Sequence, residues 1–236
     1  MEKKTKKYLS EIEGKYPEPQ FSELVDATAS VLGPLFRKEI EDFKDETFYT
    51  FLLYTWEGVD HIAPDANTEE SLEEMWQQTD PSWWAGKSEF RWIWSEWDPA
   101  RSVADIASEQ MIENKLSALR EAVGVREIEF LQDAFGINDA DDELDRRADL
   151  QQAVFDAMAS ALAKMDDDGI FRAAGPRNQY LLYVTLTDSP LTNPWEKRSA
   201  KILNPGKALA RRNRDRRVSQ ALYLPTFVSS LFSIFR

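Results

Sequence analysis

The stretch Thr47–Trp56 constrains the fold most strongly, because it reads as a strand with apolar side chains on both faces. Successive side chains of a strand point to opposite faces of its sheet. One face would carry Phe48, Leu52 and Tyr54, and the other Tyr49, Phe51 and Leu53. Such a strand is typical of the centre of a sheet that is covered on both sides.

The residues after this strand predict a hairpin and then a helix. Glu57-Gly58 suits a tight turn, since glycine tolerates positive φ, and Val59–Ala63 would return as the antiparallel partner. Pro64 would end the pairing because proline has no N–H to donate. Asn67 would cap the next helix, with Glu70 three residues later as its capping-box partner.

The remaining elements follow from hydrophobic periodicity. Apolar residues recur at helical spacing in 20–43, 102–123, 148–165 and 195–203, and at strand spacing in 83–97 and 179–187. Ser22 is the expected N-cap of the first of these helices, and Gly33-Pro34 is expected to kink or split it. Residues 124–147 hold a short apolar piece and then an acidic loop. Few strands, long helices and no repeated βαβ unit predict an α+β fold with a small, mostly antiparallel sheet and helices packed on it.

Charge is distributed unevenly along the chain. Its 236 residues carry a net charge of −13, but residues 1–7 carry +3 and residues 207–236 carry +6, so residues 8–206 carry −22. An acidic body of this kind argues against bulk nucleic-acid binding and favours basic protein partners. We expect an N-terminal arm over 1–19, an α+β domain over 20–206, and a basic then apolar extension over 207–236.

The chain has no cysteine, no apolar segment after its N-terminal lysines that would suit a signal peptide, and no stretch of about 20 apolar residues that would span a bilayer. We therefore expect a cytoplasmic protein without a transmembrane segment. The tail has three open interpretations: docking on the core, contact with a partner, or contact with a membrane surface. Docking would use Leu222, Leu224, Phe227, Leu231 and Phe235.

Few side chains suggest catalysis. His61 is the only histidine, and no sequence pattern supplies it with an orienting carboxylate and a nucleophile, so we interpret it as structural. The acidic run from Asp139 to Asp145 lacks the central glycine and the late glutamate of a calcium-binding loop. We therefore predict no catalytic residue, no metal site and no cofactor.

Several segments together resemble a known bacterial family. In order they are FYTFLLYT, IAPDANTEESLE, RWIWSEW, AVFDAMASALAKMDDDGIF, YLLYVTLTDS and a closing Trp…RSAKILNP. Over roughly residues 20–206 the chain resembles the family catalogued as domain of unknown function 4303. The resemblance implies an α+β domain and brings no established catalytic residues. Small acidic domains of this general kind are often immunity proteins that accompany bacterial toxins.

The leading hypothesis is a non-enzymatic immunity protein that occludes the active site of a basic toxin. The residues expected to contact the toxin are Trp83, Trp84, Asp139, Asp141, Asp142 and Glu143. The alternative is a carboxylate- or metal-dependent hydrolase, and a third hypothesis is an adaptor held at a membrane surface by its tail.

Overall fold

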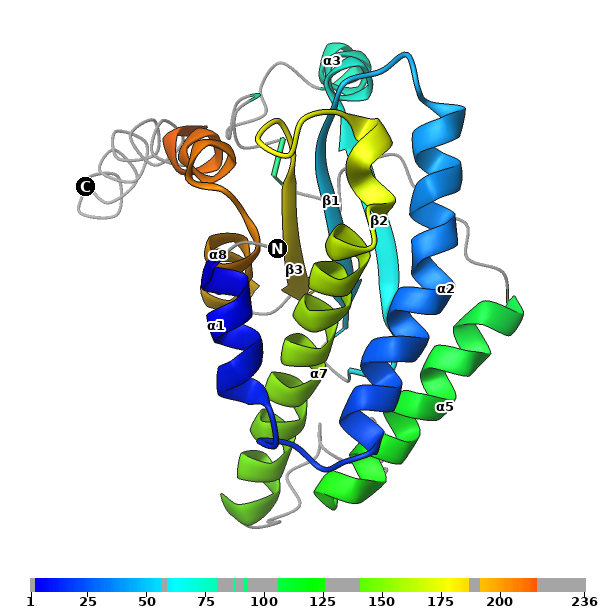
Figure 1. The fold of residues 1–236 in the computed structure, drawn as a ribbon, viewed down its shortest axis with the longest axis vertical. Coiled ribbons are helices and arrows are strands. Elements are labelled where there is room, and N and C mark those ends of the chain that lie inside the picture. The colour runs from blue at the N-terminus through cyan, green and yellow to red at the C-terminus, as the bar shows by residue number, and fades with distance from the viewer. Residues whose placement is uncertain are drawn as a thin grey trace, which may run out of the picture.

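A computed structural model describes residues 3–56, 59–79, 87, 91–92, 106–125, 141–186 and 192–215. Within these ranges three strands form one sheet, with long helices against one face and shorter elements against the other (Figure 1). In chain order the elements are α1 (Lys3–Ile12), α2 (Gln20–Asp42), β1 (Phe48–Thr55), β2 (Ala63–Thr68), α3 (Glu69–Gln78), α5 (Ile106–Val123), α7 (Asp141–Asp167), the 3-10 helix η3 (Ile170–Ala174), β3 (Leu181–Leu186) and α8 (Thr192–Leu203). Residues 206–215 form a further helix, called here the 206–215 helix.

The α+β prediction is confirmed, and the sheet is mixed. The strand order is β2–β1–β3, so β1 lies at the centre as its two apolar faces predicted. β2 pairs antiparallel with β1, whereas β3 pairs parallel with it. The parallel pairing arises because the chain between β1 and β3 crosses over through α5 and α7, and parallel neighbours require such a crossover.

An irregularity at the start of β1 changes the predicted faces. The register with β2 shifts between Phe48 and Thr50. As a result Phe48 lies with Phe51 and Leu53 on the face covered by α2 and α7. Tyr49 lies with Leu52 on the opposite face, against Leu72 of α3, Trp92 and Ala208 of the 206–215 helix.

The hairpin prediction is wrong in its second strand. β2 runs from Ala63 to Thr68 and includes Pro64, which lies opposite Leu53. Proline is tolerated here because β2 is an edge strand, where one side of the backbone needs no partner. The next helix therefore starts later than expected, and Thr68 is its N-cap rather than Asn67. The capping box is also wrong, since Glu70 instead accepts hydrogen bonds from the backbone N–H (2.7 Å) and hydroxyl (3.0 Å) of Thr47.

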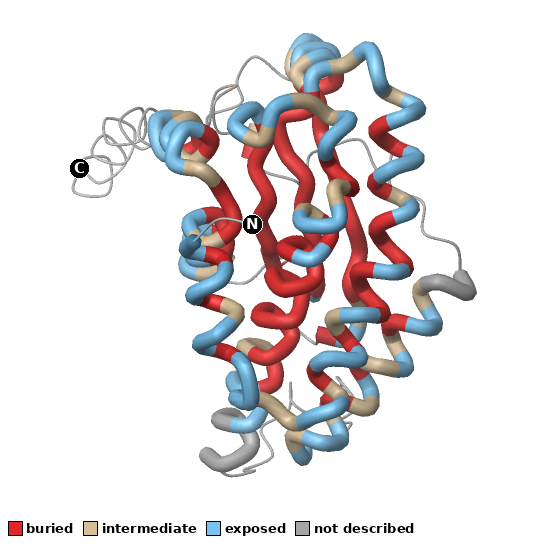
Figure 2. The backbone as a smooth tube through the Cα atoms, in the orientation of Figure 1, coloured by how far each residue is buried: buried red, intermediate tan, exposed pale blue. Residues whose placement is uncertain are grey.

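The main core lies between the sheet and the helices α2, α5 and α7. Phe51 is fully buried, and its ring lies 5.6 Å from Phe36, 4.9 Å from Phe171 and 5.4 Å from Tyr180. The predicted helices are present, and the strands and inner stripes of α2 and α7 are buried (Figure 2). α2 continues through Pro34 without a break, and Ser22 does not cap it but bonds back to Glu18 and Pro19.

The strand predicted over 83–97 lies only partly within the described residues. Arg91 and Trp92 lie in a turn, so the strand is wrong at these two residues, while the rest of 83–97 except Lys87 lies outside the described residues. Trp92 is still a core residue, with its ring 5.7 Å from that of Tyr49. None of the helices in the described ranges has the length and apolar character needed to cross a bilayer.

The outer edge of β3 is closed by side chains of α8 and the residue after it. Asn204 accepts a hydrogen bond from the N–H of Leu182 (2.7 Å) and donates to the C=O of the same residue (2.6 Å). Ser199 accepts from the N–H of Val184 at 3.0 Å. Asn204 also donates to the C=O of Ala200 (2.8 Å) at the end of α8. These two side chains take the place of a fourth strand, and an edge covered in this way is protected from pairing with another chain.

We predict that Asn204→Ala destabilises the fold by about 3 kcal/mol, because it leaves the buried N–H and C=O of Leu182 without partners. Urea unfolding followed by circular dichroism measures the difference. Asn213→Ala is the control, since Asn213 is exposed on the neighbouring helix and should change stability by less than about 0.5 kcal/mol. Equal stability of the two variants would show that Asn204 does not hold the edge.

Candidate functional site

The residues predicted to contact a partner are only partly described. Trp83, Trp84 and Asp139 lie outside the described residues. Asp141, Asp142 and Glu143 form the first turn of α7, not part of a loop as expected. Their role in binding stays a prediction.

His61 lies among aromatic rings. It is half-buried, with its ring 5.3 Å from that of Trp56 and 6.2 Å from that of Tyr54. Trp56 is itself 51% exposed, so this aromatic group reaches the surface. The surroundings agree with a packing role for His61.

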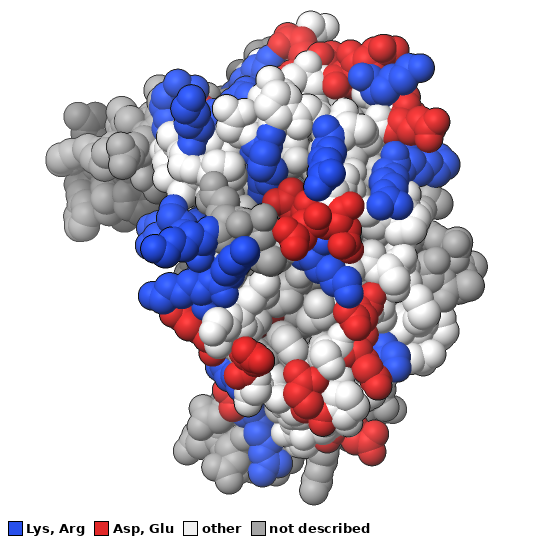
Figure 3. Space-filling view, in the orientation of Figure 1, with Lys and Arg blue, Asp and Glu red and all other residues white. Residues whose placement is uncertain are grey.

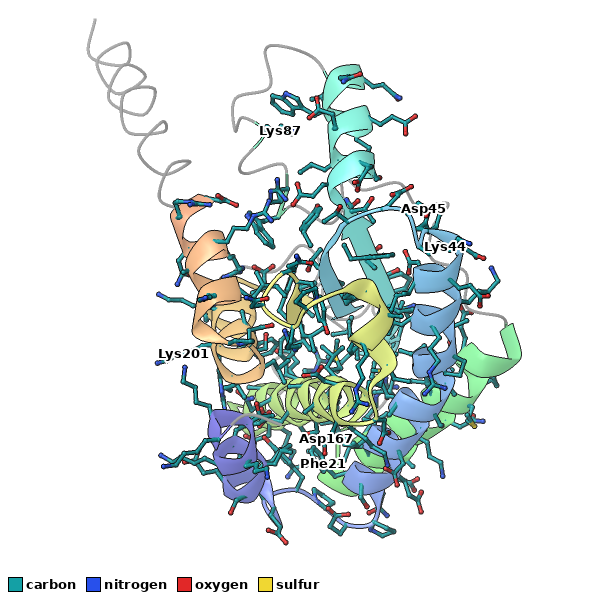
Figure 4. The ribbon with its side chains drawn as sticks, turned by 45° about the horizontal axis from the view of Figure 1, so that its top comes forward. Phe21, Lys44, Asp45, Lys87, Asp167 and Lys201 are labelled. Atoms are coloured by element: carbon teal, nitrogen blue, oxygen red, sulfur yellow. The ribbon has the colours of Figure 1, made fainter. Side chains whose placement is uncertain are left out.

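The structure gathers carboxylates on the surface of α3. Five side chains of this helix border a shallow, open hollow, and we call them the α3 acidic surface: Glu69, Glu70, Glu73, Glu74 and Gln77. They form one face because residues three and four apart on a helix are neighbours. Figure 4 shows α3 projecting from the end of the sheet, with Lys87 beside it and Lys44 and Asp45 on the loop before β1.

Local contacts fix α3 in place. The N–H of Ser71 donates to the Thr68 hydroxyl (3.2 Å), which in turn donates to Glu46. Leu72 is fully buried against the second face of the sheet. The helix is therefore capped, and its inner side is anchored while its glutamates remain outside.

Glu69 connects three parts of the chain. Its carboxylate accepts two hydrogen bonds from Arg91, at 2.7 and 2.8 Å, and one from Arg211 of the 206–215 helix. The Arg91 guanidinium lies 4.7 Å from the centre of the Tyr49 ring, and its Nε lies 3.8 Å from Asp215. Burial opposes ionisation of Glu69, but the hydrogen bonds and charges of Arg91 and Arg211 outweigh it and lower its pKa.

Two neighbouring glutamates are also held in the ionised form. Burial disfavours the charge on Glu70, but the hydrogen bonds from the backbone and hydroxyl of Thr47 and from its own backbone N–H together lower its pKa. The hydrogen bond from Lys87, then that from Gln77, lowers the pKa of Glu73. Glu70, Glu73 and Glu74 are exposed. The surface thus presents fixed negative charge to solvent at neutral pH.

Two other hollows have different characters. One of about 500 Å³, between α2, α5 and α7, is lined by the ion pairs Lys115–Glu23 (2.8 Å) and Lys164–Asp26 (2.7 Å) and by Asp168, so four of its five charged side chains are paired with one another. Another of about 390 Å³, between α1 and α2, is lined by the apolar residues Leu9, Ile12, Phe21 and Val25, by three serines and by the carboxylates of Glu13, Glu18 and Asp26.

The described ranges contain no group of three or more His, Cys, Asp or Glu residues placed to hold a metal ion. The hypothesis of a carboxylate- or metal-dependent hydrolase stays a prediction.

The α3 acidic surface was missed by sequence reasoning. The sequence interpretation treats Glu70 as a capping residue, although the spacing of Glu69, Glu70, Glu73 and Glu74 places all four on one helical face. That spacing was the available signal. The contact between Glu69 and Arg211 had none, because 142 positions separate the two residues.

We predict that Glu69→Gln lowers stability by about 1–2 kcal/mol at pH 7, because it removes the charge that binds Arg91 and Arg211. The folded-state pKa of Glu69 is lowered, so its stabilisation is present above the unfolded-state pKa and is lost as pH falls through the folded-state value. In thermal unfolding scans the difference between variant and parent should therefore begin to shrink below the ordinary glutamate pKa of about 4.3 and vanish below the lowered folded-state pKa of Glu69. The control is Glu74→Gln, on the exposed side of the same surface, which should be as stable as the parent at pH 7 and at acidic pH. A loss of stability in Glu69→Gln that does not change with pH would exclude the charge of Glu69 as its cause.

Most of the chain matches one known protein family. The family described as "Domain of unknown function (DUF4303)" matches residues 24–205, which is most of the chain and agrees with the segments that carry the resemblance. Neither curated proteins nor solved structures gave a match. The matched range includes the sheet, α3, α8 and Asn204, while α1 and the 206–215 helix lie beyond it. The chain belongs to the DUF4303 family.

Proposed function

We propose that this protein is a non-enzymatic binding protein whose α3 acidic surface receives basic side chains of a partner protein. The observation that carries the proposal is the gathering of four glutamates on one open face of α3. Guanidinium and ammonium groups suit such a face, since charge-assisted hydrogen bonds to carboxylates are among the strongest that side chains make.

The carboxylates are fixed before a partner arrives. Arg91 and Arg211 hold Glu69, Thr47 holds Glu70, and Lys87 contacts Glu73. A preorganised group loses little conformational freedom on binding, so more of its interaction energy remains as affinity. Each of the three keeps oxygen lone pairs for a second donor, because a carboxylate offers about four acceptor sites.

A bacterial toxin is the candidate partner, and the protein would then act as a cytoplasmic immunity protein. Toxins that act on nucleic acids or nucleotides need basic clefts to hold phosphates. An acidic surface that covers such a cleft would exclude the substrate by occupying its place. The charge of −22 on residues 8–206 supports this proposal, because it is larger than the magnitude of about 2–8 that solubility requires of a small domain.

Co-expression with the product of the adjacent gene tests the toxin proposal. We expect that product to be toxic alone, to be tolerated together with this protein, and to form a complex with it in size-exclusion chromatography. Toxicity that persists on co-expression, or the absence of a complex, would contradict the proposal.

The kinetics of that complex test the binding surface. We predict that Glu70→Gln, Glu73→Gln and Glu74→Gln together lower the association rate constant by about tenfold at low salt and change dissociation much less, because exposed charges mainly steer encounter. Surface plasmon resonance at several salt concentrations measures both rates. The matched control is Glu13→Gln, Glu121→Gln and Asp168→Asn, three exposed carboxylates removed elsewhere. An equal loss in both triple variants would reflect net charge alone and would exclude α3 as the contact surface.

A further inference from the structure

The fold brings the two basic ends of the described chain together. α1 packs against α8, and the 206–215 helix follows α8 directly (Figure 1). Residues 3–12 and 192–215 hold eleven Lys and Arg but only three Asp and Glu, within a chain whose net charge is −13. Figure 3 shows basic side chains gathered on the side of the molecule where these helices lie.

α1 is attached to the domain by buried polar contacts. The Thr5 hydroxyl donates to the C=O of Ile202 in α8 at 2.9 Å. Tyr8 (2.7 Å) and Tyr16 both donate to the carboxylate of Asp156, which is buried in α7. Arg198 of α8 lies 3.7 Å from the same carboxylate. The helix α1, which carries four lysines, is therefore held beside α8.

Most of these basic groups face solvent. The α1–α8 basic surface comprises nine exposed side chains: Lys3, Lys4, Lys6, Lys7, Lys197, Arg198, Lys201, Lys207 and Arg214. Lys201 projects outward from α8 in Figure 4. Of the three acidic residues in these segments, Glu196 is buried against Arg212 (2.8 Å), Asp215 lies between Arg91 (3.8 Å) and Arg214 (3.9 Å), and Glu11 pairs with Lys7 (3.4 Å). Basic residues therefore outnumber acidic ones on this surface.

We propose that the α1–α8 basic surface binds anionic lipid at a membrane surface. Clusters of four to eight Lys and Arg are typical of segments that bind anionic headgroups. The sequence continues from the 206–215 helix into Arg216 and Arg217 and then into the apolar run VSQALYLPTFVSSLFSIF. Apolar residues next to a basic cluster suit the boundary between headgroups and acyl chains, where both attractions add.

Nucleic acid fits the same surface less well. Proteins that bind nucleic acid through basic surfaces combine positive charge with aromatic rings for stacking or with arginines that contact base edges. Among the described residues the exposed large apolar side chains are Trp56 and Met111, and neither belongs to α1, α8 or the 206–215 helix. Six of the nine exposed basic residues in the surface are lysines on α1 and α8, which act as flexible point charges.

The acidic body does not prevent this contact. α3 lies at the end of the sheet and α1 and α8 lie at its side (Figure 1). At physiological ionic strength the Debye length is about 8 Å, so charges beyond the contact face are largely screened. The separation of charge would instead orient the molecule, with α1 and α8 toward the lipid.

Vesicle flotation of the full chain tests the proposal. It compares phosphatidylcholine vesicles with vesicles in which about a third of the lipid is phosphatidylglycerol. We expect binding to the anionic vesicles only, with a decline as NaCl rises from about 0.05 M to about 0.5 M. Lys3→Gln, Lys197→Gln and Lys201→Gln together should reduce the partition coefficient by about tenfold or more.

The matched control is the triple variant Arg37→Gln, Lys38→Gln and Lys44→Gln. It removes the same amount of charge from three exposed positions, two near the C-terminal end of α2 and one just after that helix. This control should bind anionic vesicles like the parent. Equal loss in both triple variants, equal binding to neutral vesicles, or no vesicle binding would overturn the proposal. Stronger retention by a duplex DNA of about 30 base pairs than by anionic vesicles would also overturn it and assign the surface to nucleic acid. None of these outcomes depends on the toxin complex, so the two proposals fail separately.

Discussion

The side chain of Asn204 joins the elements that carry both charged surfaces. It bonds both polar groups of Leu182 and the end of α8, and therefore joins helix to sheet at the outer edge of β3. α8 in turn supports α1 through Ile202 and the 206–215 helix through the buried pair Glu196–Arg212. The 206–215 helix then supplies Arg211 to Glu69 on α3. The edge contact thus positions both of the charged surfaces described above.

The two surfaces differ in how their charges are balanced. On the α3 acidic surface, Glu69 is paired with two arginines while Glu70, Glu73 and Glu74 stay exposed. On the α1–α8 basic surface the acidic residues Glu196 and Asp215 are turned toward interior arginines, which leaves the lysines exposed. On both surfaces the more buried charged groups are paired within the protein, and the exposed ones remain available to a partner.

The features that could be predicted from the sequence are those that depend on the local pattern of apolar residues. The central position of β1 followed from its two apolar faces, and the long helices followed from spacing. The errors occurred where distant residues decide the local structure. Pro64 stays in a strand because β2 lies at an edge, and Glu70 bonds Thr47 across the sheet end rather than capping its own helix. The parallel direction of β3 and the contact between Arg211 and Glu69 depend on the whole chain path, which no short window contains.

The residue after Asn204 affects how long the edge contact lasts. Asparagine ages by deamidation, in which the backbone nitrogen of the next residue attacks the side-chain amide and releases ammonia. Here the next residue is Pro205, whose ring nitrogen carries no hydrogen and cannot complete that reaction. Deamidation would put a carboxylate oxygen against the C=O of Leu182, where an amide N–H now donates at 2.6 Å. The proline therefore protects the most important amide of the fold from chemical ageing, and isoaspartate should not accumulate at position 204 during storage.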